Sequence, residues 1–579
     1  MPRHPKLGLA LSGGGFRASL FHIGVLARLA ELGVLKSVDV ISTVSGGSIV
    51  GAHYYLLLKK LLESKTDAEI KPSDYSDLVR EVERTFLAGV QRNLRTRAYA
   101  GIVDNFKMIW SKRFTRSDRM AKLYDEYFYA SAAGKRDICM NELKIAPLGW
   151  KAPAFNPRLH NEARKHKIPA LIINATTLNT GRNWQFSAVE AGEYEQDGGE
   201  TYHKNTLCVP FRYEIDGKPN PVLPKKYQEI PLSIAVAASA CVPGIFVPLP
   251  LTDLYCNFVP KLVDGGVYDN QGIFSLIHAR CTHIFVSDAS GQMDDQIQPG
   301  SGILSVLMRS NSVLTDRTRD AGFEHLSALK ECGELDFAAL HLRQEFVPPE
   351  LHPHEGPKPW ETTVPPKTKY EVRGEVQYRL SNIRTDLDSF TTIEAQSLMC
   401  SGHSMTGAYF PARWRSLFRA SPPDPKKISW GFHSMAPYVR GERRSERFKE
   451  NLKAGEALVF KAFRLVPGLG FVGIALALLL LVLLACAAVQ IGFENSIRLL
   501  GFTAFVLLVH GILSALPKEI RFLYRIDEFA MRVTAGATAM IFGWLLSRIH
   551  LLLVERLYLK YGSSPTHPPA PPSLEREGG

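Results

Sequence analysis

Short apolar runs alternate with helical patterns along the N-terminal part of the chain. Residues 7–12 form an apolar run that leads into three consecutive glycines, which is typical of a buried parallel strand followed by a tight turn. Residues 17–33 carry apolar side chains at helical spacing. A second strand is predicted over 38–44 and a second helix over 46–62. Because strands and helices alternate, we expect an α/β fold with helices on both faces of a parallel sheet.

The same alternation continues along the chain. Further strands are predicted over 169–175, 260–264 and 282–288, and further helices over 75–100, 114–130 and 392–407. Residues 185–230 are rich in loop formers, and residues 343–372 are rich in Pro, Glu and Lys and predict an exposed excursion. One domain is therefore expected over 1–410, with a core over 5–290 and an extension over 291–410.

Long apolar segments follow near the C-terminus. Residues 465–491 and 499–516 carry no charged side chain and are long enough to span a bilayer. Residues 533–547 form a shorter run that predicts either a third span or an interfacial helix. The alternative is a buried hairpin of core helices, which the run 478–484 disfavours because it has no polar face. A membrane region with two or three transmembrane helices is predicted over 465–554.

Basic residues flank this region, in a chain whose formal net charge is +12. Those before it are Arg440, Arg443, Arg444, Arg447, Lys449, Lys453, Lys461 and Arg464, and those after it are Lys518, Arg521, Arg525 and Arg532. Residues 411–464 are therefore predicted to be a basic juxtamembrane linker that attracts anionic lipid headgroups. The tail, 555–579, is predicted to be disordered. No zinc-finger spacing or aromatic–basic repeat indicates a nucleic-acid partner.

The compartment is predicted from the charges and the cysteines together. The eight cysteines form no CxxC pair, so reduced thiols are expected. Residues 1–6 lead straight into the first strand, so no secretory signal peptide is expected. By the positive-inside rule, both ends of the predicted hairpin face the cytoplasm. We expect a membrane protein whose N-terminal domain faces the cytoplasm.

The first candidate site is the glycine-rich turn at residues 12–17, Ser-Gly-Gly-Gly-Phe-Arg. Consecutive glycines let backbone N–H groups converge at a helix N-terminus, where they can bind a phosphate or the oxyanion of an acyl-transfer intermediate. Gly13, Gly15 and Ala18 also satisfy a loose dinucleotide fingerprint, so a nucleotide-binding protein is one alternative. The ribose contact of that motif belongs at the end of the second strand, whereas Asp39 lies near its start.

Two further motifs point to acyl-transfer chemistry. Ser45 lies between a strand and a helix, where a nucleophile elbow places its serine. Gly47 fills the second glycine position of that elbow, while Thr43 replaces the first. An ordinary helix cap at Ser45 explains the pattern equally well. Asp264 ends a predicted strand and could serve as general base, although a plain Asp-Gly turn is the alternative.

In their order and spacing, these motifs resemble the patatin-like phospholipases. The matching segments are 13–17 (Gly-Gly-Gly-Phe-Arg), 22–26 (His-Ile-Gly-Val-Leu), 45–48 (Ser-Gly-Gly-Ser), 238–246 (Ala-Ser-Ala-Cys-Val-Pro-Gly-Ile-Phe) and 264–266 (Asp-Gly-Gly). The resemblance covers roughly residues 5–290, with a weaker echo at 384–390. It implies a three-layer α/β/α domain with a mostly parallel sheet.

The resemblance also implies roles for these residues. Ser45 would attack an ester carbonyl, and Asp264 would accept its proton and later activate water. Gly47 belongs to the elbow, and Gly265 and Gly266 follow the aspartate. The oxyanion hole is expected to use Gly13, Gly14, Gly15 and Arg17.

The expected function is hydrolysis of carboxylic esters in phospholipids or related lipids at a membrane. A catalytically lapsed, membrane-anchored scaffold on the same fold is the alternative in another class. No metal site and no cofactor are indicated. His22 is expected to pack in the core.

Overall fold

The computed structural model describes residues 4–563 apart from 102–103, 105–114, 152–154, 195–207, 292, 294–295, 297, 348–362, 459–460, 467, 470 and 472–546. The chain divides into two compact units. The first comprises 1–95, 115–458 and 562–579, and the second comprises 96–114 and 459–561.

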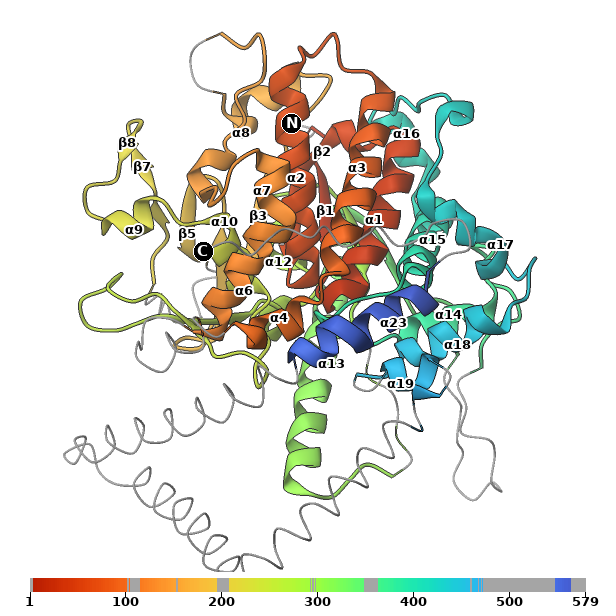
Figure 1. Ribbon diagram of the computed structural model, residues 1–579. Helices are drawn as coiled ribbons and strands as arrows, with labels where there is room; N and C mark the ends of the chain where they lie inside the picture. Colours follow the sequence, from red (N-terminus) through yellow and green to blue (C-terminus); the bar gives the residue numbers. More distant parts are fainter. Residues whose placement is uncertain are drawn as a thin grey trace, which may run out of the picture. The chain divides into compact units, whose positions relative to one another are not determined.

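The first unit is built on a ten-stranded mixed sheet (Figure 1). Its strands are β1 (Leu7–Leu11), β2 (Val38–Val44), β3 (Ala170–Thr177), β4 (Asn183–Phe186), β5 (Glu190–Glu193), β6 (Phe211–Arg212), β9 (Leu249–Pro250), β10 (Lys261–Asp264), β11 (His283–Asp288) and β12 (Asp336–His341). The order runs β12-β11-β1-β2-β3-β4-β5-β6, and the first five strands in that order are parallel. A separate hairpin pairs β7 (Glu214–Ile215) with β8 (Lys218–Pro219).

Helices connect and cover these strands. They are α1 (Gly15–Glu31), α2 (Gly46–Ser64), α3 (Pro72–Val90), α4 (Leu94–Ala100), α6 (Arg116–Tyr124), α7 (Ala130–Ala133), α8 (Pro157–His160), α9 (Lys225–Gln228), α10 (Leu232–Ser239), α11 (Gly266–Asp269), α12 (Ile273–His278), α13 (Ile303–Glu331), α14 (Gly374–Asn382), α15 (Thr392–Tyr409), α16 (Ala412–Leu417), α17 (Ala436–Val439) and α18 (Glu446–Gly455). The predicted strands and helices of the core are all present, although the helix predicted over 75–100 is divided into α3 and α4.

Alternate side chains of the parallel strands pack on opposite faces of the sheet, because a strand has a period of two. On one face, Ala10, Val40 and Ile284 form a core cluster with Leu276 of α12 and Leu326 of α13. On the other face, α1 packs against α2, α3 and α15. Two helical layers therefore enclose the sheet, and the three-layer α/β/α expectation is confirmed.

One strand departs from the parallel pattern in a way that positions the site. Strand β2 pairs with β3 as far as Val44 opposite Asn174, and antiparallel β10 pairs with the next part of β3, ending at Asp264 opposite Ala175. Strand β4 occupies the other edge of β3 over the same residues, so β2 and β10 lie along the same edge. The ends of β2 and β10 therefore meet head to head.

The segment predicted to be a basic linker, 411–464, is instead mostly part of the first unit. Its apolar side chains Trp414, Phe432 and Leu452 are fully buried. Its helices α17 and α18 pack against α15. In α18 the apolar positions Phe448 and Leu452 recur at a spacing of four, so the helix buries one face while its basic residues take the other. The basic pattern alone therefore did not indicate a linker.

Two other predictions fall largely or partly outside the described residues. Most of the predicted membrane region, 465–554, lies within 472–546, and the tail beyond 563 is likewise outside. In the part of the chain that is described, no helix has both the length and the apolar character needed to cross a membrane.

Residues 555–561 form α23 (Glu555–Tyr561), which differs from the predicted disordered tail. Within the second unit, Tyr558 of α23 is buried and packs beneath Lys461 of α19 (Lys461–Leu465), whose Nζ lies 4.3 Å from the ring centroid. The contact between Lys461 and the Tyr558 ring and the burial of this tyrosine stabilise α23.

Candidate active site

Ser45 lies on the turn between β2 and α2 in a strained backbone conformation. Its φ is 49° and its ψ is −116°, a combination that a residue with a side chain rarely adopts. Close packing of the following glycines enforces the turn. A Cβ at Gly46 would lie 2.0 Å from the carbonyl oxygen of Gly15, and one at Gly47 would lie 2.2 Å from that of Leu11. The turn has the strained geometry of an elbow, and Gly47 packs closely against the backbone of β1.

A chain of buried hydroxyl groups holds this turn from beneath. The backbone N–H of Ser45 donates to Oγ of Ser239 at 2.9 Å, and Ser239 and Ser48 share a hydrogen bond of 2.8 Å between their Oγ atoms. Ser48 donates to Oγ1 of Thr43 at 3.0 Å, and Thr43 donates to the carbonyl oxygen of Ile172 at 3.0 Å. Since Ser48 donates to Thr43, Ser239 is the donor to Ser48, and every member of the chain is satisfied.

This network explains why the chain has Thr43 where the elbow pattern usually has glycine. The hydroxyl of Thr43 anchors the network to β3, and its methyl group lies 2.6 Å from where a Cβ of Gly51 would stand. Gly51 thus leaves the space that the threonine fills. The sequence analysis did not identify the roles of Ser48 and Ser239, although Ser239 lies in the segment 238–246 quoted for the family resemblance.

Asp264 lies directly opposite Ser45 because β2 and β10 meet head to head. Its carboxylate accepts the N–H of Gly266 at 2.7 Å. Burial raises the pKa of Asp264 to about 6, against the lowering effects of the Gly266 N–H and of the Ser45 hydroxyl. A Cβ at Gly265 would lie 2.4 Å from the carbonyl oxygen of Asn174, so only glycine fits after the aspartate.

Ser239 also fixes the aspartate side of the pair. Its carbonyl oxygen accepts the N–H of Gly265 at 3.1 Å, and the carbonyl oxygen of Cys241 accepts the N–H of Asp264 at 2.9 Å. One residue at the end of α10 therefore contacts the backbone beside both Ser45 and Asp264.

The two side chains open onto a cavity of about 980 Å³. Gly14 and Gly15 line it beside Ser45, and Ile245, Val267 and Leu307 contribute apolar wall. A cavity of this size can hold a drug-sized or larger apolar ligand. The C-terminal extension also contributes to the cavity, through Thr385, Asp386 and Leu387.

The glycine turn differs from the prediction at one position. The N–H of Gly13 donates to the backbone carbonyl of Asn270 at 2.9 Å, so it is not free to bind an oxyanion. Gly14 and Gly15 have φ values of 136° and 57°, and among the described residues neither of their N–H groups donates a hydrogen bond. Two of the three predicted backbone donors therefore belong to residues that line the cavity and have no partner among the described residues.

Arg17 supports the turn and does not line the cavity. It is 3% exposed, and its guanidinium donates to the carbonyl oxygens of Ile383 at 2.8 Å and of Ser381 and Ala289 at 3.2 Å. Burial lowers the pKa of Arg17 to about 10, which still leaves the group charged at neutral pH. Arg17 thus joins α1 to the C-terminal extension.

The extension reaches the glycine turn through Asp386. Its carbonyl oxygen accepts the N–H of Phe16 at 2.9 Å, and its carboxylate pairs with Arg95. Burial and the neighbouring Asp388 raise the pKa of Asp386 to about 6. The weak echo of the family pattern at 384–390 therefore falls on residues that complete the site.

The structure weakens the nucleotide-binding alternative. Asp39 accepts hydrogen bonds from the backbone N–H of Leu7 and from Nζ of Lys167 at the amino ends of the strands. The glycine turn lies at their carboxyl ends, so this carboxylate is not placed for a ribose. His22 is fully buried and bonds Ser287 and Ser12, as expected for a core histidine.

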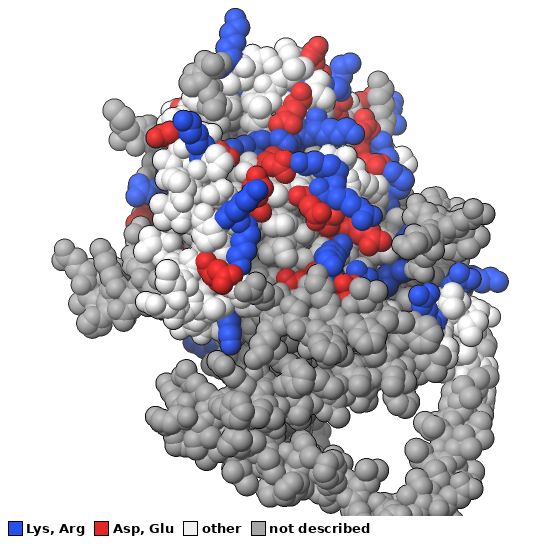
Figure 2. Space-filling view, turned by 60° about the vertical axis from the view of Figure 1, so that its left-hand side comes forward, with Lys and Arg blue, Asp and Glu red and all other residues white. Residues whose placement is uncertain are grey.

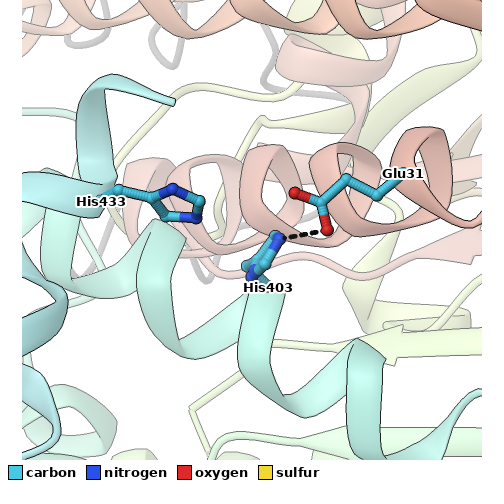
Figure 3. Close-up of side chains that lie close together, drawn as sticks. All are labelled: Glu31, His403 and His433. Carbon is cyan, nitrogen blue, oxygen red and sulfur yellow. Dashed lines mark ion pairs between the residues drawn. The ribbon is translucent and has the colours of Figure 1, made fainter. Parts of the chain in front are cut away.

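A cluster of Glu31, His403 and His433 has the spacing that a metal ion requires (Figure 3). Glu31 is already bonded, however. It accepts from Arg28 at 2.6 Å and Trp430 at 2.7 Å, and Nε2 of His403 lies 3.0 Å from its Oε2. Burial acts to raise the pKa of Glu31, but the bonds from His403, Trp430 and Arg28 outweigh it and lower the pKa to about 2. Because the guanidinium of Arg28 already occupies the Glu31 carboxylate, the cluster is better described as a polar contact that joins α1 to α15.

Charges are mixed on the described part of one face of the protein. Over the described part of the face shown in Figure 2, basic and acidic side chains are interspersed, without a large region of one sign. Where its residues are described, this face has no basic stripe of the kind that binds nucleic acid.

Comparison with known proteins places these features in context. Residues 9–277 match the family model of the patatin-like phospholipases. Among solved structures, human GIVD cytosolic phospholipase A2 matches at 14% identity over 72% of this chain and 61% of that chain, with a TM-score of 0.35. Its complex with methyl gamma-linolenyl fluorophosphonate and terbium chloride matches at 17% identity over 49% and 40%, with a TM-score of 0.29.

VipD from Legionella pneumophila matches at 13% identity over 98% of this chain and 93% of that chain, with a TM-score of 0.26. This chain spans less than two thirds of the length of the human enzyme. No curated protein matches the chain.

Proposed function

The chain carries a patatin-like phospholipase domain over residues 9–277, and from this premise we propose that it is a serine hydrolase that cleaves carboxylic esters of phospholipids or related lipids. The observation that carries the proposal is the meeting of Ser45, on its strained turn after β2, with the buried carboxylate of Asp264 at the end of β10. Both open onto a cavity large enough for lipid acyl chains.

In the proposed reaction, Asp264 takes the proton of the Ser45 hydroxyl as Oγ attacks the ester carbonyl carbon. The resulting oxyanion would accept hydrogen bonds from the N–H groups of Gly14 and Gly15, where the N-terminus of α1 adds partial positive charge. Collapse of this intermediate transfers the proton from Asp264 to the leaving alcohol. Water then attacks the acyl-serine while Asp264 removes its proton, and collapse of the second intermediate releases the fatty acid while Asp264 returns the proton to Oγ of Ser45.

The raised pKa of Asp264 suits this role. A general base works best when its pKa lies near, but below, the working pH, because it is then ionised and still basic enough to remove a proton. With a pKa of about 6, the carboxylate is ionised at neutral pH. An exposed aspartate would be a weaker base.

We place the enzyme at a membrane, with this domain on the cytoplasmic side. The support is the apolar sequence of 465–491 and 499–516 and the basic residues on either side of it. Holding the domain beside its substrate would raise the effective concentration of lipid at the active site.

The test is covalent labelling of the full-length protein, in detergent or in liposomes, with a fluorophosphonate probe, beside release of fatty acid from phospholipid. The wild type should label and should release fatty acid. Ser45→Ala should do neither, and Asp264→Asn should label far more slowly. Ser76→Ala, a buried serine elsewhere in the first unit, is the control and should behave as the wild type.

Absence of labelling in a folded wild-type protein would overturn the proposal. It would favour the alternative, a catalytically lapsed scaffold on the same fold. Labelling that persists in Ser45→Ala would show that the nucleophile is a different serine.

A further inference from the structure

The N-terminal half of α13 carries large apolar side chains in solvent. Ile303 is 83% exposed, Leu307 is 62% exposed and Leu314 is 67% exposed. A soluble domain buries such side chains unless they have a partner, because each buried side chain of this size contributes favourably to folding. We call residues 303–314 the α13 arm.

The exposed apolar side chains of the arm lie on one helical face. Positions 303, 307 and 314 are spaced by four and seven residues, and Val306, 46% exposed, lies beside them. The stripe extends over three helical turns, about 17 Å. It is therefore long enough to lie along a surface and not merely to fill one small pocket.

The remainder of α13 anchors the arm to the sheet. Leu326 belongs to the core cluster beneath the sheet. Nε of Arg319 donates to Oδ2 of Asp288, at the end of β11, at 2.9 Å. In Figure 1 the N-terminal half of α13 extends away from these contacts. The apolar stripe is thus held in a fixed direction from the domain.

The stripe is continuous with the mouth of the active-site cavity. Leu307 of the arm lines the cavity that contains Ser45. Ile245 and Val267 line the same cavity and are 55% and 45% exposed. Solvent-exposed apolar side chains therefore belong both to the arm and to the cavity wall.

We propose that the α13 arm docks on the surface of a lipid bilayer and delivers lipid to the cavity mouth. The proposal rests on the proposed function and names the surface from which the site draws its substrate. A protein partner or a second copy on the same stripe would cover Leu307 and so obstruct the entrance. A lipid surface covers the stripe and at the same time supplies the molecule that must enter.

The charge of the arm also fits a lipid surface. Arg309 is the one charged residue between 303 and 315, and no acidic residue lies in that stretch. An arm that inserts apolar side chains among headgroups avoids repulsion from anionic lipid only if it lacks carboxylates.

The proposal is tested with the full-length protein reconstituted in vesicles of phosphatidylcholine and phosphatidylglycerol in equal parts. The variant is Ile303→Ser with Leu314→Ser, neither of which lines the cavity. The matched control is Leu159→Ser with Val222→Ser, which are 71% and 85% exposed and lie outside α13. Each protein is assayed on vesicle phospholipid and on p-nitrophenyl butyrate, a soluble ester that needs no membrane.

Hydrolysis of vesicle lipid by the arm variant should fall at least about tenfold, from the loss of two apolar insertions. Hydrolysis of the soluble ester should stay within about twofold of the wild type, and the control should match the wild type on both substrates. Equal rates of vesicle hydrolysis in the arm variant and the wild type would overturn the proposal. So would an equal fall on both substrates, or conversion of a wild-type dimer into a monomer.

A measurement without catalysis separates docking from the proposed function. In a Ser45→Ala background, Leu314→Trp should be quenched by brominated phosphatidylcholine, whereas Val222→Trp should not. Absence of extra quenching at position 314 refutes docking even if the enzyme is active. Quenching without fluorophosphonate labelling of the Ser45-containing protein would support docking while the proposed function fails.

Discussion

Replacing Ser239 by alanine is expected to slow the attack by Ser45 without changing any group that touches substrate. The Ser239 hydroxyl accepts the N–H of Ser45 at 2.9 Å and bonds Ser48 at 2.8 Å, and it is fully buried. Alanine removes both bonds and admits no water to replace them. The Ser45 N–H is then left without an acceptor on a turn that is already strained.

The magnitude follows from these two bonds. A buried donor that loses its acceptor costs about 1–3 kcal/mol, and the bond to Ser48 contributes about 1 kcal/mol more. The free energy of unfolding should therefore fall by about 2–4 kcal/mol. If this whole cost is felt as a loss of turn geometry, the rate of acylation should fall about 30–700-fold, since each 1.4 kcal/mol corresponds to a factor of ten.

Two measurements check this prediction. Urea denaturation gives the change in stability, and the rate of fluorophosphonate labelling gives the reactivity of Ser45. In steady-state assays kcat should fall while KM stays close to the wild-type value, because the cavity is unchanged. Ser48→Ala, one step further along the network, should show a smaller effect of the same kind. Ser233→Ala, a buried serine on the same helix, is the control.

The reasoning fails if Ser239→Ala loses the expected stability but labels at the wild-type rate. The hydroxyl would then stabilise the fold without orienting the nucleophile. It also fails if Ser233→Ala slows labelling to the same extent, because any perturbation of α10 would then suffice.

Four further outcomes are expected. Activity should fall as the pH drops through about 6 and level off above it, because Asp264 must be ionised to act as a base and burial raises its pKa to about 6. A pH–rate profile of kcat/KM that is flat from pH 5 to 8 would contradict this role. Burial also makes the ionised Asp264 carboxylate less stable in the folded protein than in the unfolded chain. The free energy of unfolding should therefore decrease as the pH rises from 4 to 6. Asp264→Asn should lessen this dependence in thermal melts at different pH values. Gly46→Ala should abolish labelling, because its Cβ would lie 2.0 Å from the backbone oxygen of Gly15, and soluble protein that labels normally would argue against this contact. Arg17→Lys should lose at least one of three bonds to backbone carbonyls and lower stability by about 1–3 kcal/mol in urea denaturation, while leaving the pH profile in place.

Much of the fold and of the site could be predicted because it depends on local patterns. The strand and helix on either side of Ser45 follow from apolar periodicity and from the small residues that the turn requires. The same is true of the glycine turn before α1 and of the strand that ends at Asp264. In each case the residues that set the backbone conformation lie within a few positions of the residue concerned, so steric rules suffice.

Contacts between distant segments could not be predicted in this way. Gly13 looks equivalent to Gly14 and Gly15 in the sequence, and only its contact with Asn270 removes it from the set of available donors. Thr43 breaks the elbow pattern, yet its hydroxyl accepts a hydrogen bond from Ser48, which is in turn bonded to Ser239.

The sequence by itself therefore determined the order of elements in the core and singled out Ser45 and Asp264 as candidates. The tertiary structure decided which backbone N–H groups remain available and how the hydroxyl network holds Ser45. It also showed that most of 411–464 joins the first unit, because the burial of Trp414 and Leu452 outweighs the basic character of that stretch. Local sterics act along the chain, whereas hydrogen-bond satisfaction and burial depend on which distant segments meet in space.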